Sequence, residues 1–145
     1  MRPVIVTALV AAFVAAAGCA SSSNEEPCRI EGTYTATGTL ESGNCPLVDG
    51  PVTDTLTKLP DGRYRLEIQG TTGGCDLDLV DTCKVQGKCF LDVKDVVNPG
   101  DRGTVQYSWS FTRDGFSGLS AVTVPPAASL PAGCSATAKV IGKRR

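Results

Sequence analysis

The chain has 145 residues, of which 14 are Lys or Arg and 15 are Asp or Glu, so its formal net charge is −1. This balance lacks the basic surface of nucleic-acid-binding domains, and we expect no nucleic-acid partner. The sequence contains no histidine, which excludes Ser-His-Asp and Cys-His nucleophilic systems.

The N-terminal segment has the pattern of an export signal. Arg2 is followed by an apolar run over residues 3–15 and by Ala16-Ala17-Gly18, directly before Cys19. This arrangement resembles the lipobox of bacterial lipoprotein precursors, which usually have Leu where Ala16 stands. The resemblance implies that residues 1–18 are a signal peptide and that acyl chains on Cys19, palmitate among them, anchor the mature chain to a membrane. An unlipidated secretory signal has similar basic and apolar regions, but the cysteine directly after Gly18 favours lipidation.

Residues 19–27 connect this signal to the remainder of the chain. They have no apolar periodicity, so we expect the lipidated Cys19 to be followed by a flexible tether and residues 28–145 to form a single β domain. In Gram-negative lipoproteins, Asp directly after the lipidated cysteine commonly retains the protein at the inner membrane. Ala20 stands there, so the resemblance implies a cell-envelope protein, at the outer membrane if the host is Gram-negative.

Six cysteines remain when Cys19 is set aside from the seven: Cys28, Cys45, Cys75, Cys83, Cys89 and Cys134. Disulfides form in oxidising compartments, so we expect these six to form three bridges in an exported domain. A zinc site is disfavoured because the chain has no histidine and the closest cysteines are spaced too widely for C-x2-4-C ligand pairs. We therefore predict no metal and no cofactor.

Alternation of apolar and polar residues dominates the mature sequence. In residues 104–112, Val105, Tyr107, Trp109 and Phe111 alternate with polar residues, which indicates a strand buried on one face. A small or apolar residue likewise occupies every second position of residues 30–40. We predict an all-β fold, an antiparallel eight-stranded up-and-down barrel or sandwich stabilised by disulfides. The expected strands are residues 30–40, 52–59, 63–69, 75–80, 88–94, 104–112, 116–124 and 134–141.

The connections between these strands alternate in length. Residues 60–62 and 113–115 are tight hairpin turns, whereas the segments 41–51, 70–74, 95–103 and 125–133 are longer and rich in Gly and Pro. An up-and-down meander would collect the long connections at the end away from the N-terminus. Loops on a rigid scaffold carry binding residues, so this end is the candidate binding rim, with Asn98, Pro99, Pro125 and Pro126 as its residues.

The same meander constrains the disulfides. In a closed barrel the first and last strands are neighbours, which brings Cys45 close to Cys134 and makes this pair the first choice among the fifteen pairings that six cysteines allow. The predicted strands place Cys75 at the loop end and the remaining three cysteines, Cys28, Cys83 and Cys89, at the opposite end. The other two bridges therefore stay unassigned.

Two positions carry a faint resemblance to lipocalins and their calycin relatives. That family has G-x-W on the first strand and an Arg near the end of the last strand, and this chain has Gly32-Thr33-Tyr34 and Arg144 in comparable places. An eight-stranded barrel is either filled by its own side chains or holds one small ligand. Tyr107 and Trp109 would accordingly be core residues or a ligand platform.

Carboxylates offer the remaining candidate chemistry. Asp76 and Asp78 share one strand face at a spacing that paired glycosidase carboxylates also use, but a solvated strand face gives the same pattern. Residues 76–81 begin like a calcium loop, yet Val80 stands at the fifth position and Asp81 replaces the sixth-position Gly.

We therefore expect a membrane-anchored exported lipoprotein with a non-catalytic β domain. The domain binds an unknown envelope protein or small ligand, or serves an envelope structure. The alternative is an inhibitor of an extracellular hydrolase that acts through a protruding loop, for which residues 125–133 are the best candidate. An enzyme that uses carboxylates ranks third.

Overall fold

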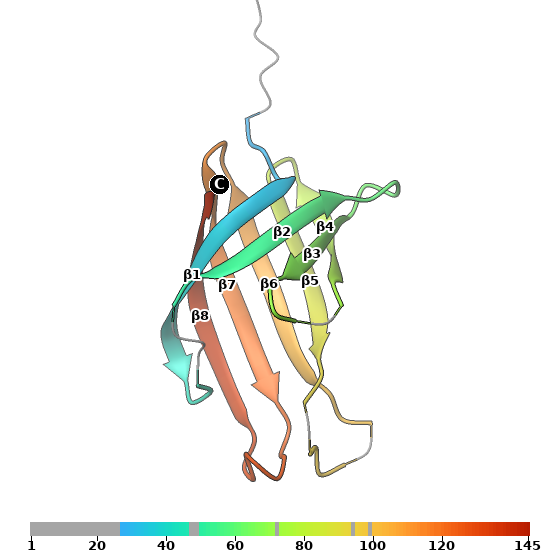
Figure 1. The fold of residues 1–145 in the computed structure, drawn as a ribbon, viewed down its shortest axis with the longest axis vertical. Coiled ribbons are helices and arrows are strands. Elements are labelled where there is room, and N and C mark those ends of the chain that lie inside the picture. Colours follow the sequence, from blue (N-terminus) through green and yellow to red (C-terminus); the bar gives the residue numbers. More distant parts are fainter. Residues whose placement is uncertain (1–26, 47–49, 72, 94, 99) are drawn as a thin grey trace, which may run out of the picture.

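The computed structural model describes residues 27–46, 50–71, 73–93, 95–98 and 100–145 (Figure 1). The predicted signal peptide, the lipidation site Cys19, most of the tether and Pro99 of the candidate rim lie outside the described residues. Within these described ranges, no helix has the length and apolar character needed to cross a membrane.

Eight antiparallel strands form a closed barrel in which each strand pairs with the next along the chain and the last pairs with the first. The all-β, eight-stranded up-and-down prediction is confirmed, and the barrel alternative is the correct one. The strands are β1 (Gly32–Gly43), β2 (Val52–Lys58), β3 (Tyr64–Ile68), β4 (Cys75–Asp81), β5 (Lys84–Leu91), β6 (Gly103–Phe111), β7 (Gly115–Val124) and β8 (Cys134–Arg144).

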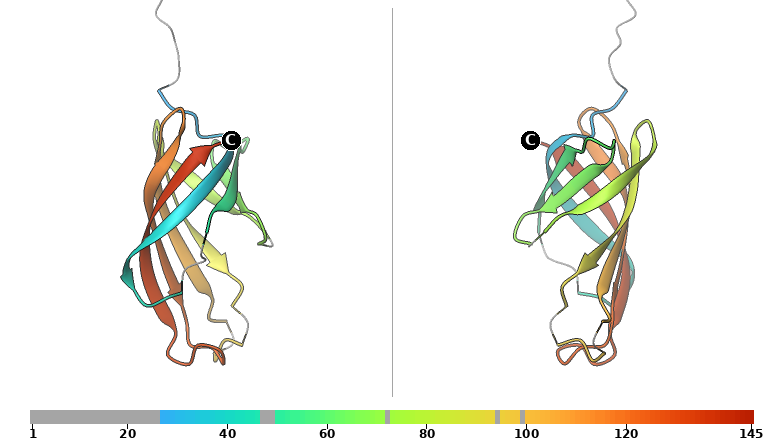
Figure 2. Two further views of the ribbon diagram at one scale, coloured as in Figure 1. Left: turned by 60° about the vertical axis from the view of Figure 1, so that its left-hand side comes forward. Right: turned by 90° about the vertical axis from the view of Figure 1, so that its right-hand side faces the viewer.

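The two ends of the barrel differ. The described chain begins and ends at one end, together with the β2–β3, β4–β5 and β6–β7 turns (Figures 1 and 2). We call this the closed end. The opposite, loop end carries the four long connections, residues 44–51, 69–74, 92–102 and 125–133. The predicted sorting of long and short connections is therefore confirmed.

The position of β5 differs from the sequence prediction. Residues 88–94 were the expected strand, whereas β5 spans Lys84–Leu91. The first half of β5 was missed because it contains Gly87, and glycine is depleted in strands. A Cβ at Gly87 would lie 2.6 Å from Cδ2 of Leu77 on β4. A side chain at this position would have to displace the end of the Leu77 side chain, and it would also crowd the Asp76 carbonyl at 3.1 Å.

The barrel wall is complete only toward the closed end. β1 pairs with β2 from Gly32 to Ala36 and continues to Gly43 along β8 alone. β2, β3 and β4 have seven, five and seven residues, against 12 in β1 and 11 in β8. The inward face predicted for residues 30–40 is therefore only half covered: Tyr34 and Ala36 are buried, but Leu40 is 45% exposed.

Aromatic side chains fill the interior toward the closed end. Trp109 stacks on Phe116 with ring centres 4.4 Å apart, and Tyr34 meets the same ring edge-on at 5.3 Å. Trp109 also donates from Nε1 to Oγ of the buried Ser120 at 3.3 Å. Toward the loop end β8 presents only Ala136 and Ala138 to the core. The interior is thus filled at one end and contains smaller side chains toward the other.

Three disulfides connect the six cysteines of the domain, as predicted. Cys45 pairs with Cys134, which confirms the first-choice bridge, and Cys28 pairs with Cys83 at the closed end. The third bridge joins Cys75 to Cys89. The predicted position of Cys89 at the closed end was wrong, because β5 begins earlier than expected and carries Cys89 to the loop end, opposite Cys75.

Candidate functional site

Two loops of the candidate rim are tied together at the loop end. The Val97 amide donates to the Pro126 carbonyl at 2.9 Å, and the Ala128 amide donates to the Asp95 carbonyl at 2.9 Å. Asn98 follows Val97 directly, so the structure brings the Asn98 segment beside Pro125 and Pro126. Pro99 lies outside the described residues.

The β7–β8 loop is folded onto its neighbour. Ala127 is 1% exposed and forms an isolated bridge with Val96 of the β5–β6 loop. Ala127 and Leu130 also exchange backbone hydrogen bonds at 3.0 Å. This loop is therefore a packed part of the loop end and not a free-standing finger.

A cavity of about 630 Å³ opens at the loop end, beside the short strands β3 and β4. Leu66, Ile68 and Tyr107 line its inner part, and Val124 and Ser129 contribute from the end of β7 and its loop. The Cys75–Cys89 bridge forms part of the wall. The volume lies within the range of ligand pockets in proteins, roughly 300 to 1,000 Å³.

A carboxylate lies in the barrel interior next to this cavity. Asp54 on β2 is 2% exposed, and its Oδ1 has no hydrogen-bond partner among the described residues. Asp54 is directly opposite Tyr34 on β1 and Ile68 on β3 in the strand pairing. Burial disfavours the charged form and raises the pKa of Asp54 to about 6.

Tyr107 is a second buried ionisable side chain beside the cavity. Its ring lines the cavity, and its pKa is raised to about 12, first by burial and then by the negative charge of Asp54. Tyr107 also packs edge-on against Trp109 with ring centres 4.8 Å apart. Trp109 is 1% exposed and belongs to the core. Of the two aromatic residues proposed as a ligand platform, Tyr107 thus reaches the cavity.

The sequence interpretation missed Asp54. A signal existed, because Val52, Asp54 and Leu56 occupy alternate positions of a predicted strand, and the first and last of these are apolar. A carboxylate between two inward-facing residues of a barrel strand must itself face inward. The carboxylates considered instead were Asp76 and Asp78.

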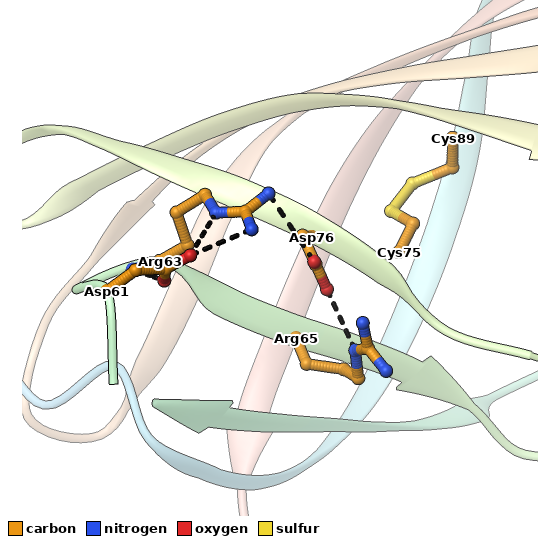
Figure 3. A network of polar contacts seen from close by, with 6 residues as sticks. All are labelled: Asp61, Arg63, Arg65, Cys75, Asp76 and Cys89. Carbon is orange, nitrogen blue, oxygen red and sulfur yellow. Dashed lines mark hydrogen bonds and ion pairs between the residues drawn. A yellow bond between two sulfur atoms is a disulfide. The ribbon is translucent and has the colours of Figure 1, made fainter. Parts of the chain in front are cut away.

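Asp76 belongs to a network of ion pairs on the outer face of the barrel (Figure 3). Its carboxylate accepts from Nε of Arg65 at 2.8 Å and lies 3.4 Å from Nη1 of Arg63, which also pairs with Asp61 at 2.8 Å. The pKa of Asp76 is lowered, mainly by the hydrogen bond from Arg65. A paired acid-base mechanism needs a carboxyl that holds its proton near neutral pH, and Asp76 has the opposite bias.

No group of three or more potential metal ligands of the His, Cys, Asp or Glu type occurs within the described ranges. The calcium-like segment at residues 76–81 forms most of β4 instead of a loop. Asp76 and Asp78 share one face of this extended strand but are spaced about 6.6 to 6.8 Å apart along it, so their carboxylates do not converge as those of a calcium loop do.

The residues of the lipocalin-like pattern meet at the closed end. Arg144 donates through Nη1 to the Arg29 carbonyl at 3.3 Å and through Nη2 to the Glu31 carbonyl. Gly32 has a φ of +145°, and a Cβ there would overlap the Arg144 guanidinium. Arg144 therefore holds the segment that leads into β1 against the end of β8.

Comparison with protein-family models, curated proteins and solved structures finds no match for this chain.

Proposed function

We propose that the protein is an exported, lipid-anchored lipoprotein whose β domain binds a small and largely apolar ligand without catalysing a reaction. The observation that carries the proposal is the cavity of about 630 Å³ at the loop end. An apolar cavity with a few polar groups is the usual form of a ligand site. The aromatic residues that fill the closed end supply a rigid base for it.

The position of the termini supports the anchoring part of the proposal. Residue 27 and the C-terminus are at the closed end (Figures 1 and 2). A lipid on Cys19, a few residues before Cys28 in sequence, would leave the loop end and the mouth of the cavity directed away from the membrane. A ligand or an envelope partner could then reach the mouth without passing the bilayer.

The hydrolase-inhibitor alternative has less support. An inhibitor acts through a loop that reaches into a partner's cleft, whereas the β7–β8 loop packs on the β5–β6 loop and contributes Ser129 to the cavity wall. This arrangement favours a role for the loop as a wall of the ligand site.

The cavity is tested with a neutral fluorescent probe, N-acetylated dansylcadaverine, titrated into the purified domain. We expect saturable binding with a blue-shifted emission that the substitution Val124→Trp abolishes, because the indole would fill the cavity. Val97→Trp is the matched control, since Val97 is 61% exposed and is absent from the cavity lining. Absence of binding, or equal loss in both variants, would refute a ligand site here and leave an envelope-structural role.

The anchor is tested separately by intact mass spectrometry of the membrane fraction. The expected product begins at an acylated Cys19, and a Cys19→Ala protein should leave the membrane. A soluble product cleaved elsewhere, or a Cys19→Ala protein that stays membrane-bound, contradicts the anchoring proposal.

A further inference from the structure

The carboxylate of Asp54 has no explanation in the packing of the barrel. Within the described part of the chain, its Oδ1 is the single buried side-chain nitrogen or oxygen that lacks a hydrogen-bond partner. Burial of an unpaired carboxylate is costly, and an apolar residue of similar size would avoid that cost. An unsatisfied group of this kind calls for a partner from outside the chain.

The position of Asp54 shows from where such a partner could come. Asp54 is directly opposite Ile68 in the β2–β3 register, and Ile68 lines the cavity. Opposed residues of antiparallel strands have Cβ atoms about 4.5 to 5.5 Å apart. Tyr107 also lines the cavity, and the negative charge of Asp54 contributes to its raised pKa. The carboxylate therefore stands one side chain behind the inner wall.

The described charged groups of the cavity lining are acidic. Among the residues that the structure describes, its lining contains the carboxylate of Asp92 and no Lys or Arg. Nη2 of Arg102 lies 3.8 Å from Oδ1 of Asp92, and its guanidinium carbon lies 5.4 Å from the centre of the Phe90 ring. These contacts hold the Arg102 cation at the outer rim of the cavity. The inner part contains Tyr107, whose ring face can attract a cation. An anionic ligand in the inner part would approach the buried carboxylate of Asp54, whose Oδ1 has no hydrogen-bond donor among the described residues.

We infer that the cavity takes a ligand with a protonated amine on an apolar body, and that the carboxylate of Asp54 binds the ammonium group. This inference rests on the proposed function, since it names the class of ligand for the same cavity. The ammonium supplies the hydrogen-bond donors that Oδ1 lacks, and charge-assisted hydrogen bonds are about twice as strong as neutral ones. The apolar body would contact Leu66, Ile68 and Val124.

Two probes that differ by one acetyl group, which removes the positive charge, test the inference. Dansylcadaverine carries a primary ammonium, and its N-acetyl derivative has the same fluorophore and chain without the charge. We expect the amine to bind the wild-type domain about tenfold to a hundredfold more tightly than the acetylated probe. Asp54→Asn should remove this difference and leave the affinity for the acetylated probe unchanged. Retained binding of the acetylated probe also shows that the variant is folded.

Asp78→Asn is the matched control, because it removes the same charge from an exposed position on β4. It should keep the preference for the amine. Equal affinity of the wild-type domain for the two probes, or a preference that survives in Asp54→Asn, overturns the amine inference, including the case in which water alone satisfies Asp54. In that case binding that Val124→Trp weakens still supports the proposed function. Failure of both probes to bind refutes the proposed function and this inference together.

Discussion

The guanidinium carbon of Arg144 lies 5.4 Å from the centre of the Tyr34 ring, and Nη1 of Arg144 donates to the Tyr34 hydroxyl at 3.2 Å. Tyr34 is fully buried on β1, and its single hydroxyl proton is shared between the carbonyls of Arg29 at 2.7 Å and Ile30 at 2.8 Å. One arginine at the end of β8 thereby fixes the first strand and the segment that precedes it. This contact closes the barrel where the chain enters and leaves it.

Arg144→Met should therefore destabilise the domain while keeping much of the side-chain volume. We expect a loss of about 1 to 3 kcal/mol in the free energy of unfolding, because the Glu31 carbonyl loses its Arg144 donor and the Arg29 carbonyl and the Tyr34 hydroxyl each lose one hydrogen bond. Urea unfolding followed by Trp109 fluorescence measures it. Lys143→Met, at the neighbouring exposed position, should change stability by less than about 0.5 kcal/mol. Equal effects of the two substitutions would show that Arg144 acts only through its charge.

Much of the barrel could be predicted because the inward face of β6 is apolar throughout. Val105, Tyr107, Trp109 and Phe111 alternate in the sequence, and all four are buried. Closure of the meander also predicts that the first and last strands are neighbours, which assigned Cys45 to Cys134 correctly.

Features that depend on local packing across strands could not be predicted. Gly87 has no pattern of its own in the sequence, since its role depends on Leu77 of the neighbouring strand β4. Leu40 follows the inward period but is exposed, because β2 is too short to cover it. The cavity arises from these unequal strand lengths, and the period of a single strand carries no information about its neighbours' lengths.

The disulfides should contribute unequally to stability. Cys45–Cys134 joins residues 89 positions apart, and Cys75–Cys89 joins residues 14 positions apart. In the chain-entropy description the longer loop stabilises more, here by about 1.6 kcal/mol. We expect the Cys45→Ala/Cys134→Ala protein to unfold at lower denaturant than the Cys75→Ala/Cys89→Ala protein. The reverse order would mean that packing of the Cys75–Cys89 bridge outweighs chain entropy. Six reactive thiols in the native domain would contradict all three bridges.

The β7–β8 loop offers a test of its role as a wall. Ala127 is 1% exposed, whereas its neighbour Ala128 is exposed. Ala127→Glu would bury a charge and should release the loop from the β5–β6 loop, so we expect faster amide exchange at Val97 and weaker binding of the neutral probe. Ala128→Glu is the matched control and should leave both unchanged. Unchanged probe binding in Ala127→Glu would show that the loop does not shape the cavity.

Asp54 should make the stability of the free domain depend on pH. Its pKa is about 6 in the fold, against 3.8 as the ordinary value. The folded state therefore binds the proton more tightly than the unfolded state, and stability decreases as pH rises between these two values. Tyr34 and Tyr107, the ionisable neighbours from β1 and β6, titrate far above this range. A shift of two pKa units corresponds to about 3 kcal/mol.

Asp54→Asn removes this titration and should be more stable than the wild type at about pH 8, by up to about 3 kcal/mol, with a difference that shrinks toward about pH 4. Urea unfolding of both proteins across this pH range measures the difference directly, because every other titrating group is common to the two. Asp78→Asn is the matched control for the loss of one carboxylate, because it removes the group from an exposed position. A constant difference between wild type and Asp54→Asn from about pH 4 to about pH 8 would mean that Asp54 is solvated in the folded protein. Saturation with dansylcadaverine should stabilise the wild type more than Asp54→Asn at about pH 8, because ligand binding adds to folding stability and the ammonium offsets the unpaired charge.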